Sequence, residues 1–383
     1  MSKIKLLDTC TIRTGKLDSN ASIENGKYPF FTCAPEPLHI DTFAFDEDAI
    51  LLAGNNAQGN FHLQRYKGKF NAYQRTYVIT AKEGWNVDYI RYSIEISLNH
   101  LKSISQGSQT KFLTMSMLDD FYIDKRTEKE QEHLISVLKA IDDKVNLNKQ
   151  INDNLQHQLK LLYDYWFTQF DFPNENGKPY RASGGAMVWN EQLKRKIPVN
   201  WKAEMLSDVF EVTMGSSPTG DSLNDNNNGI EFYQGSTDFG SLYPTERIYT
   251  TAPIRYAKQQ DVLLSVRAPV GALNIAMNNC CIGRGLAAIH HESTAYTWCT
   301  LKALQPFFDI FNANGTTFGA LTSDDLKNHY IISPDNDVLQ AFIRISKPIE
   351  EKMRVISKEI RQLSTLRDWL LPMLMNGQAT ISD

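Results

Sequence analysis

The sequence has few cysteines, no long apolar run and little net charge. Its five cysteines form no C-x-x-C pair, which argues against a zinc site or a disulfide framework and fits a reducing compartment. No apolar run of about 18 residues occurs, so no membrane span is predicted, and the N-terminus lacks the apolar core of a secretion signal. With a net charge of −4 over 383 residues, the chain is not expected to coat nucleic acid generally. We therefore expect a cytoplasmic protein with room for two or three domains.

The usual signatures of catalysis are also missing. The chain has no P-loop and no G-x-G-x-x-G fingerprint, neither G-x-S-x-G nor H-E-x-x-H, and no Pro-Pro pair, which adenine methyltransferases carry in their Asp/Asn-Pro-Pro-aromatic motif. One nuclease-like match, Pro334-Asp335 followed by Glu350-Glu351-Lys352, falls in a predicted helix. Helix positions two apart point about 200° away from each other, so we expect these residues to be exposed helix charges. No catalytic, cofactor-binding or metal-binding residue is predicted.

Two similar stretches lie 208 positions apart. GSQTKFLTMSMLDDFYI spans residues 107–123 and GTTFGALTSDDLKNHYI spans residues 315–331. The identical pairs are Gly107/Gly315, Leu113/Leu321, Thr114/Thr322, Leu118/Leu326, Tyr122/Tyr330 and Ile123/Ile331. Further matches, with small changes of offset, are Leu6, Asp8 and Gly15 with Leu206, Asp208 and Gly215, then 50–52 and Gly59 with 262–264 and Gly271, then 73–75 near 283–285. A period of about 200 residues is too long for a solenoid repeat, so the chain contains a duplicated domain.

A heptad pattern follows each of these stretches. The first runs through Leu134, Leu138, Ile141, Val145, Asn148, Asn152, Leu155, Leu159, Leu162 and Trp166 at alternating spacings of four and three. Adding 208 to the first nine positions gives seven apolar residues, so the second segment has the same phase. The pattern predicts two long helices that pair as a coiled coil, in which the two asparagines could fix the register. The alternative is that each helix packs only on its own globule.

The predicted fold class is α+β. Apolar runs at 49–53, 76–80 and 261–266 predict short buried strands. We predict a first domain at 1–124, a central helix at 125–170, a linker at 171–200, a second domain at 201–335 and a C-terminal helix at 336–376. If the helices pair as an antiparallel coiled coil, two similar mixed α/β heads form a pseudo-two-fold symmetric molecule. Such symmetry suits two spaced half-sites on duplex DNA.

A basic window occurs at an equivalent place in each copy. Residues 49–81 contain no acidic residue, and Asp261 is the single acidic residue among residues 247–291. A basic window in an acidic domain is typical of a DNA-facing edge, although a solvated loop surface would look the same. Arg, Lys, Asn and Gln are the side chains that contact base edges, and they also contact phosphates. The candidate DNA-binding residues are Gln58, Asn60, Arg65, Lys67, Lys69, Gln74, Arg75, Lys111, Arg255, Lys258, Arg267, Asn274 and Arg284.

The stretches that open each heptad segment are interpreted as joints. Most of their matched positions are apolar or small, and each stretch leads into a helix. We expect them to close the heads and to set the angle at which the helices leave. Lys111 is the exception worth testing for a DNA contact, because the copy has Gly319 there. The aromatic residues Tyr73 and Tyr77 are expected to pack.

This layout resembles the specificity subunit of Type I restriction-modification systems. The resemblance is carried by L-x-D…G at the start of each copy, by GSQTKFLT and GTTFGALT before the helices, and by YDYWFTQFDFPNENGKPY after the first helix. Within the last stretch, FPNENGKPY at 172–180 is especially typical of the family. The resemblance covers essentially the whole chain. It implies two target-recognition domains, each followed by a spacer helix, and low similarity between the heads because each recognises a different half-site.

The resemblance also implies a function that the residues alone do not establish. Such a subunit is non-catalytic, and it binds double-stranded DNA with a bipartite site, two methyltransferase subunits and restriction subunits. S-adenosylmethionine, ATP and Mg²⁺ are expected on those partner subunits and none on this chain. One departure is that the second heptad segment ends soon after Leu370. The alternatives are a solitary specificity protein, a stand-alone site-specific DNA endonuclease and a two-headed coiled-coil scaffold.

Overall fold

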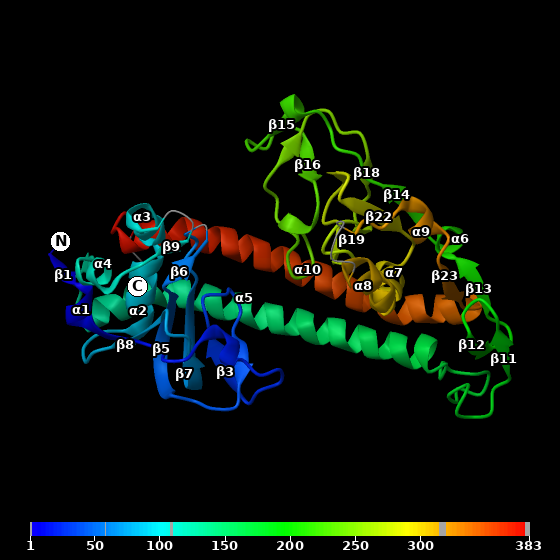
Figure 1. The fold of residues 1–383 in the computed structure, drawn as a ribbon, viewed down its shortest axis with the longest axis horizontal. Coiled ribbons are helices and arrows are strands. Elements are labelled where there is room, and N and C mark those ends of the chain that lie inside the picture. Colours follow the sequence, from blue (N-terminus) through cyan, green and yellow to red (C-terminus); the bar gives the residue numbers. More distant parts are fainter. Residues whose placement is uncertain (1, 58, 108–109, 314–318, 380–383) are drawn as a thin grey trace. The chain divides into compact units, whose positions relative to one another are not determined.

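The structure is a computed structural model that describes residues 2–57, 59–107, 110–313 and 319–379. It divides into two compact units, the first made of residues 1–146 with 361–383 and the second of residues 147–360. Each unit contains one head and part of each long helix (Figure 1). Among the described residues, no helix combines the length and the apolar character needed to cross a membrane.

The first head is built on a six-stranded sheet with the order β2-β8-β5-β7-β3-β4. Strand β5 (Phe45–Ala53) lies inside this sheet, and its alternate residues enter two different cores, with Ile50 and Leu52 on one face and Leu51 on the other. The strand predicted at 49–53 is therefore confirmed. The other elements are β1 Lys3–Lys5, α1 Leu6–Thr9, β2 Cys10–Thr14, η1 Ser19–Ala21, β3 Tyr28–Phe31, β4 Leu38–Ile40, β6 Asn55–Asn56, β7 Leu63–Ala72, β8 Thr76–Ala81, α2 Val87–Glu95, α3 Leu98–Ile104, β9 Lys111–Phe112, α4 Met115–Asp119 and β10 Tyr122–Asp124.

The second head contains a four-stranded sheet, β14-β22-β19-β20, and a five-stranded sheet, β15-β17-β16-β21-β18. A hairpin, β11 Met187–Asn190 with β12 Arg195–Pro198, precedes it. The elements of the head are β13 Lys202–Met205, α6 Leu206–Val209, β14 Glu211–Met214, η3 Gly220–Ser222, β15 Leu223–Asn224, β16 Ile230–Tyr233, η4 Ser236–Asp238, β17 Tyr249–Thr250, β18 Tyr256–Ala257, β19 Val262–Ser265, β20 Leu273–Ile275, β21 Cys280–Ile282, β22 Leu286–His290, α7 Thr294–Ala303, α8 Gln305–Ala313, α9 Ser323–Lys327 and β23 Tyr330–Ser333.

The duplication predicted from the sequence is visible in the strand pairing of the two heads. Strand β1 pairs antiparallel with β10, and β13 pairs antiparallel with β23. Strand β8 joins β2 to β5 in the first head, as β22 joins β14 to β19 in the second. In both heads a parallel pair lies beside these strands, β3 with β7 and β16 with β21. The order of pairing is the same although the loops differ in length.

Two long helices follow the heads. Helix α5 (Glu128–Tyr163) continues into a short π-helix, η2 (Asp164–Thr168), and helix α10 spans Asn336–Met375. Within the second unit, the Asn148 side chain bonds to Glu359 (2.9 Å) and the Asn152 side chain bonds to Ser357 (2.8 Å). The residue numbers therefore decrease along α10 in the direction in which they increase along α5. The predicted antiparallel pairing is confirmed for this unit. Both asparagines are at least nine-tenths buried, as expected of seam residues that fix a register.

The first unit shows the same antiparallel pairing. Arg367 of α10 bonds to Asp142 of α5 (3.1 Å), and further toward the start of α5, Leu134 and Leu138 share a core with Leu374 of α10. The alternative in which each helix packs only on its own globule is wrong, because α5 ends in the core of the second head. There, the hydroxyls of Tyr163 and Thr300 lie 3.2 Å apart, and Leu159 is in the core cluster of that head.

Candidate nucleic-acid interface

A group of loops at one end of the sheet in the first head is held by five backbone hydrogen bonds. We call it the first loop cluster; it comprises 15–17, 32–33, 54–56, 73–75 and 111–113. Each bond runs from an amide N–H to a carbonyl. The pairs are Tyr73 to Phe31 (2.9 Å), Thr76 to Tyr73 (2.9 Å), Gly54 to Arg75 (2.8 Å), Leu113 to Gly54 (2.8 Å) and Gly15 to Thr76 (3.4 Å). The cluster therefore joins the ends of β2, β3, β5, β7 and β8 to the stretch that leads into α5.

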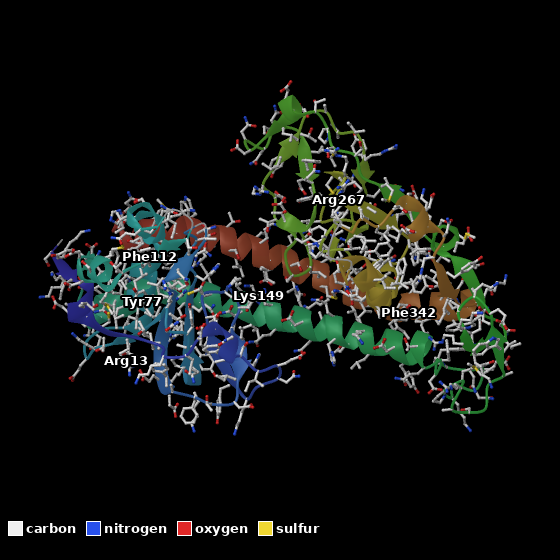
Figure 2. All side chains as sticks on the ribbon, in the orientation of Figure 1. Arg13, Tyr77, Phe112, Lys149, Arg267 and Phe342 are labelled. Atoms are coloured by element: carbon white, nitrogen blue, oxygen red, sulfur yellow. The ribbon has the colours of Figure 1, made fainter. Side chains whose placement is uncertain are left out.

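The second head has the same arrangement, the second loop cluster, at 215–217, 234–235, 266–268, 283–285 and 319–321. The equivalent bonds are Gly283 to Tyr233 (2.8 Å), Leu286 to Gly283 (3.0 Å), Val266 to Gly285 (2.9 Å), Leu321 to Val266 (2.9 Å) and Gly215 to Leu286 (2.9 Å). Figure 2 labels Tyr77 and Phe112 in the first head and Arg267 in the second. Two unrelated loop sets would not share five bonds in the same order, so the clusters are equivalent.

The glycines that the sequence comparison matched explain part of this geometry. A Cβ atom on Gly15 would lie 1.9 Å from the Ala72 carbonyl oxygen, and one on Gly215 would lie 2.1 Å from the Gly283 carbonyl oxygen. Neither position has room for a side chain, because the loop backbones approach each other closely. Tyr77 is buried, as predicted, and its hydroxyl donates to the Leu113 carbonyl (2.9 Å). It thus ties the predicted joint to the sheet.

Several candidate residues of the first head have partners within that head. Arg65 bonds to Asp48 (2.9 Å) and Asp88 (2.8 Å). Lys67 and Lys69 of β7 stand opposite Asp48 and Asp46 of β5, so the acidic start of β5 balances the basic window. Asn60 accepts a hydrogen bond from Lys102 (2.7 Å), and Gln58 lies outside the described residues. The first loop cluster contains the remaining candidates, Gln74, Arg75 and Lys111.

In the second head, too, some candidate residues have partners within the head and others are exposed. Lys258 pairs with Glu211 (3.0 Å). Asn274 is fully buried and bonds to the Gly240 backbone in both directions, at 2.9 and 3.2 Å. In this structure the Asn274 side chain therefore has a structural role away from the surface, unlike the exposed candidates of this head. Arg255 is exposed, and Arg267 and Arg284 are exposed in the second loop cluster.

Some cluster residues were missed by the sequence analysis. Asn55 follows Gly54 as Arg267 follows Val266, so Asn55 and Arg267 occupy equivalent positions. Gln234 and Ser217 also lie in the second loop cluster, where the Ser217 hydroxyl donates to the Gln234 amide oxygen (2.8 Å). The signal that could have found Asn55 was its place directly after the first predicted strand and Gly54. No local pattern marked Gln234 or Ser217.

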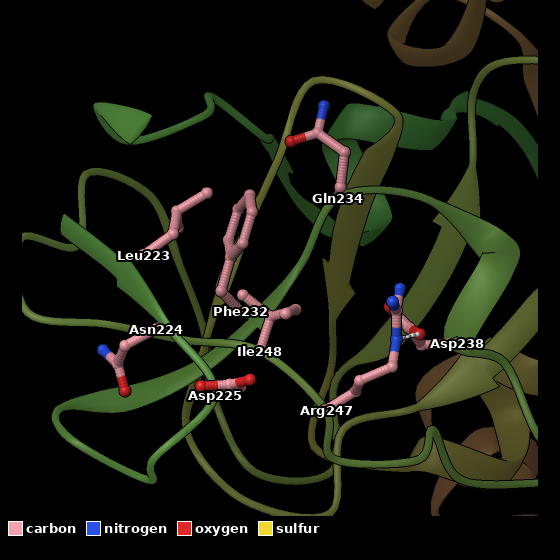
Figure 3. A pocket seen from close by; sticks show the side chains of 8 residues that line it. All are labelled: Leu223, Asn224, Asp225, Phe232, Gln234, Asp238, Arg247 and Ile248. Carbon is pink, nitrogen blue, oxygen red and sulfur yellow. Dashed lines mark hydrogen bonds and ion pairs between the residues drawn. The ribbon is translucent and has the colours of Figure 1, made fainter. Parts of the chain in front are cut away.

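A cavity of about 460 Å³ lies beside the second loop cluster, with Gln234 among its lining residues (Figure 3). Its other lining residues include Asp225, Asp238 and Arg247, and Arg247 pairs with Asp238 (2.7 Å). The hydrogen bond and the charge of Asp238 raise the pKa of Arg247. With two carboxylates against one guanidinium, the cavity does not favour phosphate. The exposed cations Arg267 and Arg284 lie in the second loop cluster and do not line this cavity.

The nuclease-like residues have structural partners. The Asp335 carboxylate accepts from the Val338 amide at the start of α10 (3.0 Å). The Glu350 carboxylate accepts from the Ser293 hydroxyl and from the Ala295 amide (both 2.9 Å) at the start of α7. The expectation that Glu350 is an exposed helix charge is wrong, because it is partly buried and joins α10 to α7. Lys352, two positions on, is exposed.

Glu350→Gln is expected to change how stability depends on pH. Burial raises the pKa of Glu350 above its ordinary value of 4.5, although the bonds from Ala295 and Ser293 act in the opposite direction. A raised pKa means that the folded state binds the proton more tightly, so this stabilisation is lost as pH rises through the folded pKa. Glutamine keeps an acceptor oxygen but does not titrate. Urea unfolding between pH 4 and pH 7 should show the variant gaining stability relative to the wild type as pH rises; parallel curves would contradict this.

The chain is similar to known proteins over most of its length. The model of the family described as Type I restriction modification DNA specificity domain matches residues 1–157 and 198–363. The Type I restriction enzyme MjaIX specificity subunit of Methanocaldococcus jannaschii is 26% identical over 323 residues, which cover 80% of this chain and 72% of that protein. The Type I restriction enzyme EcoDI specificity subunit of Escherichia coli is 32% identical over 220 residues, which cover 55% of this chain and 48% of that protein.

The fold also has a solved counterpart. The crystal structure of the Type-I restriction-modification system S subunit from M. genitalium superposes with a TM-score of 0.56 at 15% sequence identity, covering 97% of this chain and 95% of that one. The chain spans about half to three quarters of the length of the curated relatives it matches. The family model matches each copy of the duplicated domain, head and helix together. The chain therefore belongs to the family of Type I restriction-modification DNA specificity domains.

Proposed function

We propose that this chain is the DNA specificity subunit of a Type I restriction-modification enzyme and has no catalytic activity of its own. Each head recognises one half of a bipartite DNA site through its loop cluster, and the paired helices fix the spacing between the halves. The observation that carries this proposal is the repetition of one loop cluster on five equivalent backbone hydrogen bonds. The same scaffold presents different side chains in each head, as two different half-sites require.

The charges of the two heads support the loop clusters as the DNA-facing surface. Among the described residues, Arg75 and Lys111 in the first cluster and Arg267 and Arg284 in the second form no ion pair. Arg65 and Lys258 instead pair with carboxylates of their own head, while Lys67 and Lys69 stand opposite acidic residues of β5. An unpaired cation favours DNA binding because it displaces counterions from the DNA phosphates. A cation that is already neutralised by a carboxylate adds little to the binding free energy.

The partners and cofactors of the proposed complex follow from the same assignment. Two methyltransferase subunits carry S-adenosylmethionine, and restriction subunits carry ATP and Mg²⁺, so this chain binds none of these in our proposal. The candidate docking surfaces are the exposed apolar side chains of the helices, such as Leu161 on α5, Tyr165 on η2, and Val355 and Trp369 on α10, which are 40–59% exposed. The complex would act in the cytoplasm, where its DNA is.

The experiment that tests the proposal compares the chain alone with the chain plus a methyltransferase subunit. DNA is incubated with S-adenosylmethionine and Mg²⁺, and DNA binding, methyl transfer, cleavage and the modified sequence are measured. We expect no turnover by the chain alone and adenine methylation at a bipartite site by the complex. Methylation or cleavage by the purified chain would overturn the non-catalytic assignment, and failure of both preparations to bind DNA would favour the scaffold alternative.

A further inference from the structure

The central residues of two equivalent turns differ between the heads. Gln74 is the middle residue of the turn between β7 and β8, and Arg284 is the middle residue of the turn between β21 and β22. The turns are equivalent because Tyr73 and Gly283 donate to the ends of β3 and β16, and because Arg75 and Gly285 accept from Gly54 and Val266. Gln74 and Arg284 therefore occupy the same place on the two loop clusters.

Both side chains are exposed and uncommitted. In the part of the chain that the structure describes, neither the side-chain carboxamide of Gln74 nor the guanidinium of Arg284 makes a hydrogen bond, an ion pair or a ring contact. This sets them apart from Arg65, Asn60 and Asn274, whose side chains are engaged inside their own heads. An uncommitted side chain keeps its full donor and acceptor capacity for a ligand.

The backbone beneath these two side chains is held in place. The Gln74 amide N–H donates to the Leu17 carbonyl (2.9 Å), and the Arg284 amide N–H donates to the Ser217 hydroxyl (3.4 Å). In the second head, a Cβ atom on Gly283 or Gly285 would lie 2.5–2.6 Å from Gln234, so the residues beside Arg284 are packed without side chains. A fixed backbone with one free side chain at its centre limits where that side chain can reach.

We infer that Gln74 and Arg284 determine specificity at one corresponding base pair of each half-site, with Gln74 selecting adenine and Arg284 selecting guanine. Glutamine can accept from adenine N6 and donate to N7, and arginine can donate to both O6 and N7 of guanine. This inference rests on the proposed function. It predicts that the two half-sites differ at this position, with adenine in the half contacted by the first head and guanine in the half contacted by the second.

The test exchanges the two residues in the complex with its methyltransferase subunit. Gln74→Arg is expected to change one base pair of one half-site from A·T to G·C, and Arg284→Gln to change one base pair of the other half-site from G·C to A·T. The expected discrimination between the two bases is about 5- to 150-fold in the rate of methylation. Mapping methylated adenines on a library randomised in both half-sites measures it. Gln74→Ala and Arg284→Ala should relax the same base pairs without imposing a new base.

Arg75→Gly is the matched control, because it gives the first head the residue that the second head carries at the equivalent position, Gly285. It should weaken binding equally for all sequences and reduce the salt dependence by about one counterion, without changing the methylated sequence. If all the exchanged and alanine variants methylate the wild-type sequence with unchanged selectivity, the inference is overturned while the proposed function stands. If the wild-type complex methylates no bipartite site, the proposed function itself fails.

Discussion

Phe342→Ala is expected to lower the free energy of unfolding of the second unit by about 3–5 kcal/mol. The Phe342 side chain is fully buried, and its ring lies 4.9 Å from Phe167, 6.0 Å from Trp166 and 6.4 Å from Tyr296 between ring centroids. These partners come from the short π-helix η2, which follows α5, and from α7 of the second head. Removing the ring therefore leaves a cavity where three elements meet (Phe342 is labelled in Figure 2).

The control for Phe342 lies three residues further along the same helix. Ile345 is 46% exposed, so Ile345→Ala should cost less than about 1 kcal/mol. Urea unfolding followed by tryptophan fluorescence would report the second unit, because Trp166 and Trp201 are in its core. Similar losses for the two variants would show that Phe342 does not join these elements.

Asp142→Ala is expected to lower the free energy of unfolding of the first unit by about 2–4 kcal/mol. The Asp142 carboxylate accepts from Arg367 (3.1 Å), from the Tyr92 hydroxyl (2.8 Å) and from Arg91. Both arginine side chains are about one-sixth exposed, at 15% and 16%. Burial alone would lower the pKa of Arg367. The hydrogen bond and the charge of Glu95, together with Asp142, outweigh burial and raise this pKa above its ordinary value. Without Asp142, two partly buried cations lose a shared anion.

Two comparison variants isolate this effect. Asp143 is exposed on the same turn of α5, so Asp143→Ala should leave stability nearly unchanged. The double variant Asp142→Ala with Arg367→Met should recover part of the loss, because it removes one of the two cations that then share the remaining carboxylate of Glu95. Thermal unfolding of all three variants measures the result. An Asp142→Ala protein as stable as the wild type would mean that the network adds nothing to the pairing of α5 with α10.

The fold was predictable because two signals agreed along the chain. The heptad spacing gave the phase of both helices, and the matched glycines and apolar runs located the duplicated heads. The heptad pattern alone does not explain why the second helix has polar residues at two of the heptad positions. Ser346 is fully buried and bonds to the Ile343 carbonyl (3.3 Å), and Arg367 pairs with Asp142, which lies beside the apolar seam of the other helix. The partner of Ser346 lies one turn back in the same helix, whereas the partner of Arg367 comes from a distant element and leaves no local pattern.

The candidate site was less predictable than the fold. A basic window shows where cations are in the sequence but not which carboxylates face them, and Arg65 and Lys258 have such partners. Composition likewise could not show that Asn274 is buried. The equivalence of Gln74 and Arg284 depends on hydrogen bonds between loops far apart in the sequence. The sequence comparison placed 73–75 near 283–285, but the hydrogen bonds establish the residue-by-residue equivalence, because the loops between the matched strands differ in length.

The most direct test of the two-headed account is a chain in which the second head, residues 202–333, replaces the first, residues 3–124. The equivalent strand pairs β1–β10 and β13–β23 close the two heads and provide matching joints. The complex of this chain with its methyltransferase subunit would be assayed by mapping methylated adenines on randomised DNA. We expect a bipartite site whose two halves are the same sequence in inverted orientation. A site that keeps both wild-type halves, or one in which both halves change, would contradict it.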